Sequence, residues 1–306
     1  MTTVGTLKIG TRASVLARTQ TGLIVDALGV EVQVVPIVTT GDRSAESLAQ
    51  LGGTGVFVSA LREALLSGEI DVAVHSFKDL PTAAADGIVV AAVPRREDPR
   101  DALVARDGLT LGQLPTGSTV GTGSPRRAAQ LRALGLGLNI VDLRGNVDTR
   151  VGRVRSGDLD AVVLAYAGLR RLGRGDEVTE VLDPIQVLPA PAQGALAIEC
   201  RASDANVRAV LAGLEHFDTR IAVTAERALL AALEAGCSAP VGALAEIAEG
   251  DHGSEVFLRA NVTALDGSDA VRLSATGTTT DAEGVGRRLA VELLADGADQ
   301  IMGSLS

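Results

Sequence analysis

The sequence predicts two related α/β domains that flank a ligand cleft, followed by a smaller α+β domain. Three observations support this fold class. Over the first two thirds of the chain, short apolar runs alternate with amphipathic helical segments, a pattern typical of βα units with parallel strands. Residues 67–80 align with residues 156–169 without a gap, and the alternation ends near residue 217.

The alternating region contains two series of strands. In the first series, strands are expected at 7–10, 30–38, 70–74 and 87–93, with a helix from about Ser14. In the second, strands are expected at 118–121, 138–143 and 160–165, with a helix over 124–134.

The two series resemble each other beyond the aligned segment, since "IGT" (9–11) and "VGT" (120–122) each close a strand before a helix. The match is short, so coincidence remains the alternative. Related domains of this kind commonly bind a ligand in the cleft between them. The aligned copies differ at one turn, where Lys78 and Asp79 stand opposite Ala167 and Gly168. The fold therefore does not require the charged pair, which favours a functional role over the alternative that Asp79 caps a local turn.

The last third of the chain has a different pattern. Residues 218–236 form an amphipathic helical segment, with Asp218 or Thr219 as the expected N-cap and Gly236 as the C-terminal stop. Apolar strands follow at 241–247, 256–265 and 270–277, and the Asp-Gly pair at 266–267 predicts an antiparallel hairpin. A closing helix is expected over 281–299.

The composition excludes several classes of protein. No apolar run approaches the roughly 20 residues that span a bilayer, and the first residues lack the pattern of a signal peptide. We therefore expect a cytoplasmic protein without a membrane partner. A net charge of −10 argues against nucleic-acid binding. The two cysteines make no disulfide framework, and no CxxC or HExxH pattern indicates a metal site.

Basic side chains cluster at the expected strand ends, although the protein is acidic. The carboxyl ends of strands in open α/β sheets line the ligand crevice. Guanidinium groups bind carboxylate or phosphate bidentately, so the cluster predicts a ligand with several acidic groups. Asp79 would stay ionised among these cations and could stabilise a cationic centre or move a proton. The basic residues are Arg12, Lys78, Arg126, Arg127, Arg144, Arg150, Arg170 and Arg171.

Cys237 directly follows Gly236 in the segment "EAGCSAPVGA". Its small neighbours leave room for a substituent on the sulfur. The C-terminal end of a helix does not favour a thiolate, so a permanent attachment point fits better than a turnover nucleophile. An inert loop cysteine is the alternative. Cys200, at the end of an apolar run, is interpreted as structural.

Eight segments in order resemble the porphobilinogen deaminase (hydroxymethylbilane synthase) family of tetrapyrrole, or haem, biosynthesis. They are "IGTRAS", "VHSFKDLP", "REDPRDA", "VGTGSPRRAAQL", "LRGNVDTR", "LPAPAQGALAIECR", "VTAERALL" and "GCSAPVGA". The resemblance implies two periplasmic-binding-protein-like α/β domains and a C-terminal α+β domain. It places domain 1 at 1–94 and 195–212, domain 2 at 100–190 and domain 3 at 217–306.

The resemblance also implies the chemistry. A transferase of this family condenses four porphobilinogen molecules head to tail, with loss of ammonia, onto a dipyrromethane cofactor, and releases hydroxymethylbilane by hydrolysis. Cys237 would hold the cofactor through a thioether. Asp79 would bind pyrrole N–H groups, stabilise the cationic azafulvene-like intermediate and help to move protons. The implied protein has porphobilinogen as its small-molecule partner and acts as a monomer.

Further residues follow from the same resemblance. The implied carboxylate-binding side chains are Arg12, Lys78, Arg126, Arg127, Arg144, Arg150 and Arg171. Other implied contacts are Ser14, Gln20, Phe57, Ser76, Thr122, Ser124 and Gln193, with Phe57 packing on a pyrrole ring. The protein has only two lysines but 26 arginines. Lys78 would supply a compact ammonium group for substrate carboxylates that shift as the pyrrole chain grows.

The resemblance is incomplete in the expected flap at 40–55, where Gln50 and Thr54 stand at positions at which lysines are expected. Two other classes of protein stay open. A solute-binding protein with the same cleft would take up its ligand reversibly and release no ammonia. A phosphoryl transferase would need Mg²⁺, but the sequence has no GxxxxGK[ST] loop.

Overall fold

The computed structural model describes residues 5–37, 55–235, 239–250 and 253–303, without the side chains of 55–57 and 303. These residues divide into two compact units. Unit 1 comprises Met1–Glu97 and Ala195–Arg220, and unit 2 comprises Asp98–Gly194 and Ile221–Ser306. The three-domain division of the sequence stays a prediction.

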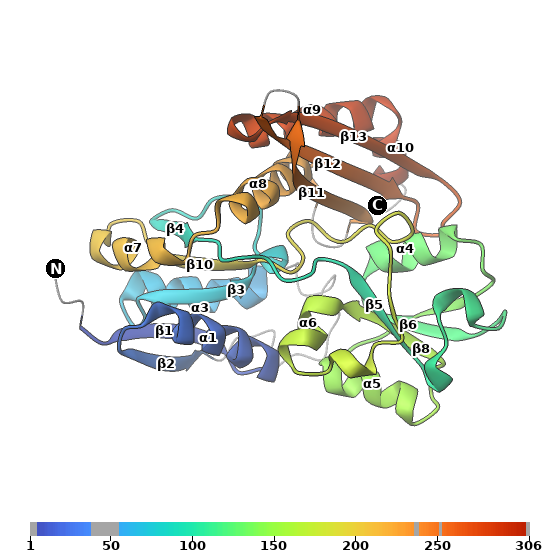
Figure 1. Ribbon diagram of the computed structural model, residues 1–306, viewed down its shortest axis with the longest axis horizontal. Helices are drawn as coiled ribbons and strands as arrows, with labels where there is room; N and C mark the ends of the chain where they lie inside the picture. The colour runs from blue at the N-terminus through green and yellow to red at the C-terminus, as the bar shows by residue number, and fades with distance from the viewer. Residues whose placement is uncertain (1–4, 38–54, 236–238, 251–252, 304–306) are drawn as a thin grey trace. The chain divides into compact units, whose positions relative to one another are not determined.

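Unit 1 is built on a five-stranded sheet with the order β2-β1-β3-β10-β4 (Figure 1). Its strands are β1 (Leu7–Arg12), β2 (Val32–Ile37), β3 (Val72–Ser76), β4 (Ile88–Ala92) and β10 (Leu196–Arg201). Strand β1 is parallel to β2 and β3, whereas β10 is antiparallel to β3 and β4. The four strands expected from the sequence therefore run in one direction, as predicted, whereas β10, which comes from a distant part of the chain and was not predicted, runs against them.

Helices cover both faces of this sheet. Ile24 of α1 (Val15–Leu28) packs with Ile9 and Val74 on one face. Leu61 of α3 (Gly55–Ser67) packs with Ala73 on the other. The helices α7 (Ala205–Leu211) and η5 (Ala212–Leu214) complete the unit.

Unit 2 contains a second five-stranded sheet, with the order β7-β6-β8-β5-β9. Its strands are β5 (Asp101–Ala105), β6 (Thr119–Thr122), β7 (Asn139–Asp142), β8 (Ala161–Ala165) and β9 (Glu180–Val181). Its helices are α4 (Pro125–Ala133), α5 (Val147–Arg155) and α6 (Tyr166–Arg171), with short turns η2 (Arg106–Gly108), η3 (Leu111–Gln113) and η4 (Gly175–Glu177). Strand β5 is antiparallel to β8, as β10 is to β3.

The two sheets have the same register as well as the same order. In the first sheet, Gly10 pairs with Ala73. In the second, Gly121 pairs with Val162. This register agrees with the sequence alignment of "IGT" with "VGT" and of 67–80 with 156–169. At both glycines a Cβ atom would lie within about 3 Å of leucine or isoleucine side chains, so a larger residue would require these side chains to shift.

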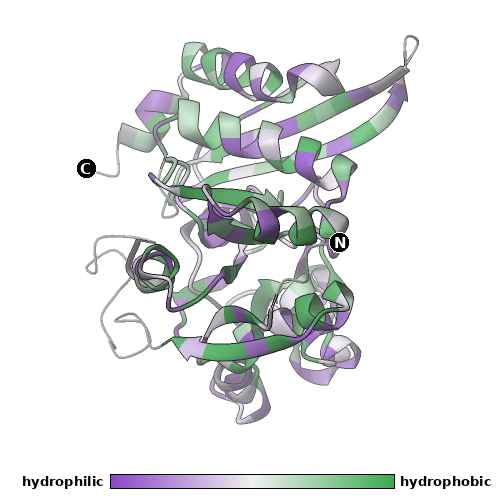
Figure 2. Ribbon diagram, turned by 90° about the vertical axis from the view of Figure 1, so that its left-hand side faces the viewer, coloured by the Kyte–Doolittle hydropathy of each residue, from purple (hydrophilic) through white to green (hydrophobic). Residues whose placement is uncertain are grey.

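The rest of unit 2 contains an antiparallel sheet, β11-β12-β13, and several helices, the first of which begins in unit 1. The elements are α8 (Phe217–Ala232), β11 (Val241–Gly250), β12 (Gly253–Thr263), β13 (Ala270–Thr278), η6 (Thr279–Asp281), α9 (Ala282–Ala295) and α10 (Ala298–Gly303). The predicted hairpin is confirmed, since β12 pairs with β13 across the Asp-Gly turn. Hydrophobic and hydrophilic residues both occur along the long strands of this sheet (Figure 2), and in β13 half-buried and exposed positions alternate.

Two expected helix boundaries are wrong. Helix α8 begins at Phe217, before both proposed caps, and the His216 ring accepts a hydrogen bond from the Thr219 N–H. The single closing helix is divided into α9 and α10, because Gly297 between them adopts a φ of 96°. No helix in the described segments is long and apolar enough to cross a membrane.

Candidate active site

Asp79 lies in the turn η1 (Phe77–Asp79), directly after the buried strand β3. The turn is anchored by the buried Phe77 ring and by hydrogen bonds from the Phe77 N–H to the Ala195 carbonyl and from the Leu80 N–H to the Phe77 carbonyl. The Asp79 carboxylate is half-buried, and within the described part of the chain it accepts no hydrogen bond and forms no ion pair. The structure therefore does not support the alternative that Asp79 caps this turn.

Unit 1 gathers three of the predicted residues at one sheet edge. Strands β1 and β3 are parallel neighbours, so Arg12, at the end of β1, lies at the same edge as Lys78 and Asp79. All three side chains are half-buried.

Three other predicted contacts of unit 1 have identifiable partners. The Ser14 hydroxyl caps α1 by accepting a hydrogen bond from the Ala17 N–H at 3.3 Å. The Gln20 amide donates to the Ser76 hydroxyl at 3.0 Å. Phe57 belongs to α3, but its side chain lies outside the described atoms.

In unit 2 the turn before α4 is tightly packed. The Ser124 N–H donates to the Thr122 hydroxyl at 3.3 Å, and the Ser124 hydroxyl in turn caps α4. A Cβ atom on Gly123 would lie 2.5 Å from the Leu143 carbonyl oxygen. Pro125 then begins the helix, where its missing N–H costs no hydrogen bond.

Arg126 and Arg127 are buried against Asp101, which sequence reasoning did not identify. Asp101 Oδ2 accepts from Arg126 Nη2 at 2.8 Å, and Oδ1 accepts from Arg127 Nε at 2.9 Å. The Gln193 amide donates to Asp101 Oδ1 at 2.8 Å. Burial alone would raise the pKa of Asp101, but the two arginines and Gln193 lower it to about 2.

The remaining arginines of unit 2 differ in exposure. Arg144 is exposed and lies 3.6 Å from Asp142. Arg171 donates to the Gly194 carbonyl at 2.7 Å. Arg150 is half-buried and donates to the Gly145 carbonyl at 2.7 Å. Its pKa is lowered, chiefly by burial and further by the positive charges of Arg127 and Arg144, with Asp142 acting in the opposite direction.

Unit 1 also contains a buried ionic cluster that the sequence analysis missed. Glu199 of β10 accepts from Arg62 of α3 at 3.1 and 2.7 Å. Its Oε2 lies 3.2 Å from His75 Nε2. Burial would raise the pKa of Glu199, but His75 and Arg62 lower it to about 2. The only signal in the sequence was a glutamate inside the apolar run "GALAIEC", since buried acids normally have partners.

Cys237 and residues 40–54 of the expected flap, with Gln50 and Thr54, lie outside the described residues. Cys200 is fully buried in β10, and burial raises the pKa of its thiol. No group of three or more potential metal ligands is found among the residues that the structure describes.

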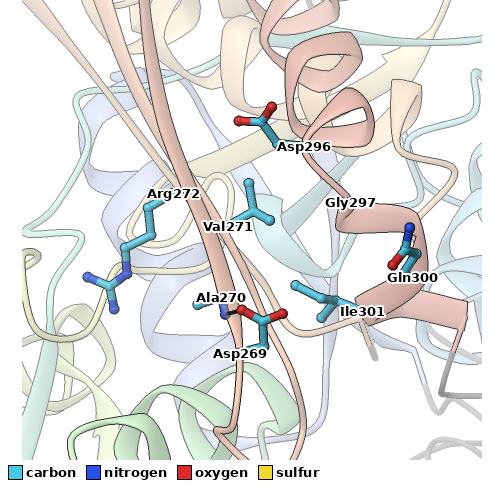
Figure 3. A pocket seen from close by; sticks show the side chains of 8 residues that line it. All are labelled: Asp269, Ala270, Val271, Arg272, Asp296, Gly297, Gln300 and Ile301. Carbon is cyan, nitrogen blue, oxygen red and sulfur yellow. Dashed lines mark hydrogen bonds between the residues drawn. The ribbon is translucent and has the colours of Figure 1, made fainter.

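A surface pocket of about 430 Å³ lies at the start of β13, beside the junction of α9 and α10 (Figure 3). Asp269, Asp296 and Gln300 line it, and Asp269 Oδ1 accepts from the Ala270 N–H. Arg272 donates to the Ile185 carbonyl. None of the predicted site residues lines this pocket, and it brings together no group suited to the predicted chemistry.

Comparisons with known proteins agree with the sequence motifs. The family model described as "Porphobilinogen deaminase, dipyromethane cofactor binding domain" matches residues 7–209, and "Porphobilinogen deaminase, C-terminal domain" matches residues 220–295. Porphobilinogen deaminases of Mycobacterium tuberculosis and Mycobacterium bovis are 61% identical to the chain, covering 97% of it and 98% of their own length. The enzyme of Mycobacterium marinum is 60% identical, covering 97% of the chain and 96% of its own length.

Among solved structures, the methionine-binding protein MetQ is similar with a TM-score of 0.43 and 14% identity. The similarity covers 67% of this chain and 88% of that protein.

Proposed function

The chain belongs to the porphobilinogen deaminase family, and we propose that Asp79, Cys237 and seven basic side chains carry out the family's reaction. It is a transferase of tetrapyrrole biosynthesis that condenses four porphobilinogen molecules head to tail, with loss of ammonia, and releases hydroxymethylbilane. Its matched N-terminal region binds a dipyrromethane cofactor. The assignment of roles to individual residues is the proposal.

The charges of unit 2 fit a ligand that carries acetate and propionate groups. Arg150 is half-buried, and Arg127 and Arg144 lie close enough to lower its pKa. A carboxylate placed there would relieve the repulsion between these cations and form charge-assisted hydrogen bonds. When it is bound, dipyrromethane supplies the pyrrole carbon to which the first substrate unit is joined.

The two cysteines offer unequal attachment points for the cofactor. Cys200 is enclosed in β10, where burial raises the pKa of its thiol and leaves no room for a substituent. Cys237 stands among small residues in "GCSAPVGA". We therefore assign the thioether to Cys237.

We assign the catalytic role to Asp79, because its half-buried carboxylate has no partner in the described part of the chain. Such a group can accept hydrogen bonds from pyrrole N–H groups. The substrate's C–N bond breaks as ammonia leaves, and the Asp79 carboxylate stabilises the positive charge that develops on the substrate. Asp79 would then accept the proton that is released when the new carbon–carbon bond forms.

The basic side chains divide into two groups by their contacts. Arg12, Lys78, Arg144, Arg150 and Arg171 are proposed to contact substrate or cofactor carboxylates directly. The guanidinium groups of Arg126 and Arg127 form ion pairs with Asp101. Arg126 Nε is buried and makes no hydrogen bond, which supports its use by a bound carboxylate. The polar side chains of Ser14, Gln20, Ser76, Thr122, Ser124 and Gln193 are proposed to shape the same sites, and Phe57 to pack on a pyrrole ring.

We further propose that the chain acts as a monomer in the cytoplasm, with porphobilinogen as its partner and without nucleic acid or membrane. Its net charge of −10 supports the absence of a nucleic-acid partner.

Asp79→Asn tests the role of the carboxylate. The amide keeps the shape and one acceptor oxygen but removes the charge, so kcat should fall by about 100-fold or more. Stability should change by less than about 0.5 kcal/mol, because no partner is lost. Steady-state production of hydroxymethylbilane and urea unfolding measure the two effects.

Asp86→Asn is the matched control, since Asp86 is an exposed carboxylate in the same unit. It should retain the wild-type kcat. If Asp79→Asn also kept the wild-type kcat, Asp79 would not be the catalytic group.

A further inference from the structure

A largely buried cluster of charged and polar side chains lies at the end of β3, close in sequence to the turn that carries Asp79. It joins Arg62 of α3, Glu199 of β10 and His75 of β3. Glu199 and His75 are only 2% and 6% exposed, and the Arg62 side chain is 18% exposed. His75 precedes Asp79 by four residues, and only Ser76 separates it from the turn η1.

The cluster anchors one face of the end of β3, and a second polar contact anchors the other. Ala73 packs on the α3 face of the sheet, and Val72 and Val74 pack on the α1 face. By alternation, His75 belongs to the α3 face, where it contacts Glu199, and Ser76 to the α1 face, where it contacts Gln20. The end of the strand is therefore held on one face by the Gln20–Ser76 hydrogen bond and on the other by the 3.2 Å contact of His75 with Glu199, which lacks hydrogen-bond geometry but joins His75 to the hydrogen-bonded Arg62–Glu199 pair.

The second copy of the repeat shows that the fold does not need this cluster. Strand registers make Leu164 equivalent to His75 and Val104 equivalent to Glu199. The sequence offset of the repeat makes Val151 equivalent to Arg62. Leu164, Val104 and Val151 pack together in one apolar cluster.

The copy with the ionic cluster is also the copy with the charged turn, since Ala167 and Gly168 stand at the positions of Lys78 and Asp79. Replacing a buried ionic triad by apolar residues is often neutral or stabilising, so stability alone gives no reason for the cluster. Polar contacts restrict direction more strongly than apolar packing does.

We propose that Arg62, Glu199 and His75 are positioning residues that fix the direction in which the Asp79 carboxylate points. This inference rests on the catalytic role proposed for Asp79. Displacing a catalytic group by about 1 Å can reduce a rate by about 100-fold. Loss of the cluster should therefore reduce kcat while the protein remains folded.

The test uses the full-length holoenzyme and the residues that the second copy supplies. In the triple variant Arg62→Val, His75→Leu and Glu199→Val, the expected result is a urea midpoint close to that of the wild type and a kcat lowered at least about tenfold. KM should change much less than kcat, because no proposed carboxylate-binding side chain is altered. A folded triple variant with the wild-type kcat would overturn the inference.

A milder variant covers the case in which the triple variant does not fold. Glu199→Gln keeps the shape and removes the charge, and its kcat is measured at a temperature at which the variant is fully folded. Its control is Asp71→Asn, which breaks the 2.7 Å pair with Arg201 at the opposite end of β3. Glu199→Gln should lower kcat and Asp71→Asn should not, whereas equal kcat values in both would reject the inference.

Two further comparisons complete the test: His75→Gln with His75→Leu, and Asp79→Asn with the cluster variants. His75→Gln can still present an N–H to Glu199 and should keep more activity than His75→Leu; equal losses would contradict a directional contact. If Asp79→Asn keeps its activity, the proposed function itself fails. If Asp79→Asn loses activity and the cluster variants do not, only the positioning role fails.

Discussion

Three acidic side chains lie in or next to apolar strands. They differ in whether their carboxylates have partners within the protein. Asp101 is buried beside two arginines and Glu199 beside His75 and Arg62, and these partners lower the pKa of each carboxyl to about 2 against the opposing effect of burial. These two carboxylates already have their charges compensated. Asp79 is half-buried and has no such partner in the described residues. Its charge therefore remains available to a bound substrate.

The sequence singles out Asp79 as a candidate but does not show that some of the predicted arginines already pair with a carboxylate of the protein. Arg126 and Arg127 resemble anion-binding residues at the start of a helix, and both are bound to Asp101, which precedes them by 25 and 26 residues. A contact over this separation depends on β5 entering the sheet beside β8. The local pattern contains no information about that pairing.

The proposal that Cys237 holds the cofactor, and that Cys200 does not, can be tested by mass spectrometry. Intact mass under denaturing conditions should show an excess equal to two condensed pyrrole units in the wild type. Cys200→Ser should keep the excess, because Cys200 is enclosed in β10. Cys237→Ser should lose it. An excess that persists in Cys237→Ser would contradict the assignment, and an unmodified wild type should gain the adduct after incubation with porphobilinogen.

At the scale of elements, the turn between β6 and α4 depends on a close approach of backbone to backbone. A Cβ atom at Gly123 would lie 2.5 Å from the Leu143 carbonyl oxygen, and this neighbour is backbone that cannot rotate away. The motif "GTGSPRR" therefore needs glycine for packing as well as for any ligand. The sequence located this turn correctly because Ser124 and Pro125 are strong signals for the start of a helix.

Gly123→Ala should accordingly destabilise the protein by about 1–3 kcal/mol through overpacking. It should also raise KM, because Arg126 and Arg127 follow the displaced turn. Gly152→Ala is the control within α5, where the added Cβ meets nothing within 4 Å beyond its chain neighbours and its own helix backbone, and it should stabilise the helix by about 0.5–1 kcal/mol. Urea unfolding and steady-state kinetics measure both effects. Equal stabilities of the two variants would refute the packing argument.

Helix ends were predicted less well where the signal was ambiguous. Both Asp218 and Thr219 are good N-cap residues, yet α8 begins before them with the His216 ring accepting the Thr219 N–H. Which residue caps a helix depends on the direction from which the chain enters that helix. That direction depends here on the His216 N–H, which bonds to the Val93 carbonyl far away in the sequence.

At the scale of the whole molecule, the internal repeat was the most informative pattern. It correctly predicted two sheets of the same design. Gly10 in the first sheet and Gly121 in the second occupy equivalent positions. The antiparallel strands β10 and β5 escaped prediction, because an apolar run does not encode its direction relative to its neighbours. The same repeat now provides an internal reference, in which a polar position in one copy can be compared with its apolar equivalent in the other.

Among the described residues, each unit contains one fully buried carboxylate with a lowered pKa, so the free energy of unfolding should depend on pH. The pKa falls from 3.8 to about 2 in Asp101 and from 4.5 to about 2 in Glu199. A lowered folded-state pKa contributes stability above the unfolded value, and this contribution is lost as the pH falls towards the folded value. The free energy of unfolding should therefore decrease between about pH 4.5 and 2. Glu199 alone should account for about 3 kcal/mol of this decrease.

Urea unfolding at steps between pH 7 and 2 measures the loss. Glu199→Gln should be less stable than the wild type at pH 7 but should lose less stability on acidification, because the titrating group is gone. Its remaining loss includes that of Asp101 in the other unit. Glu63→Gln, an exposed change on the same helix as Arg62, should follow the wild-type curve. Parallel curves for Glu199→Gln and the wild type would mean that Glu199 does not carry this acid sensitivity.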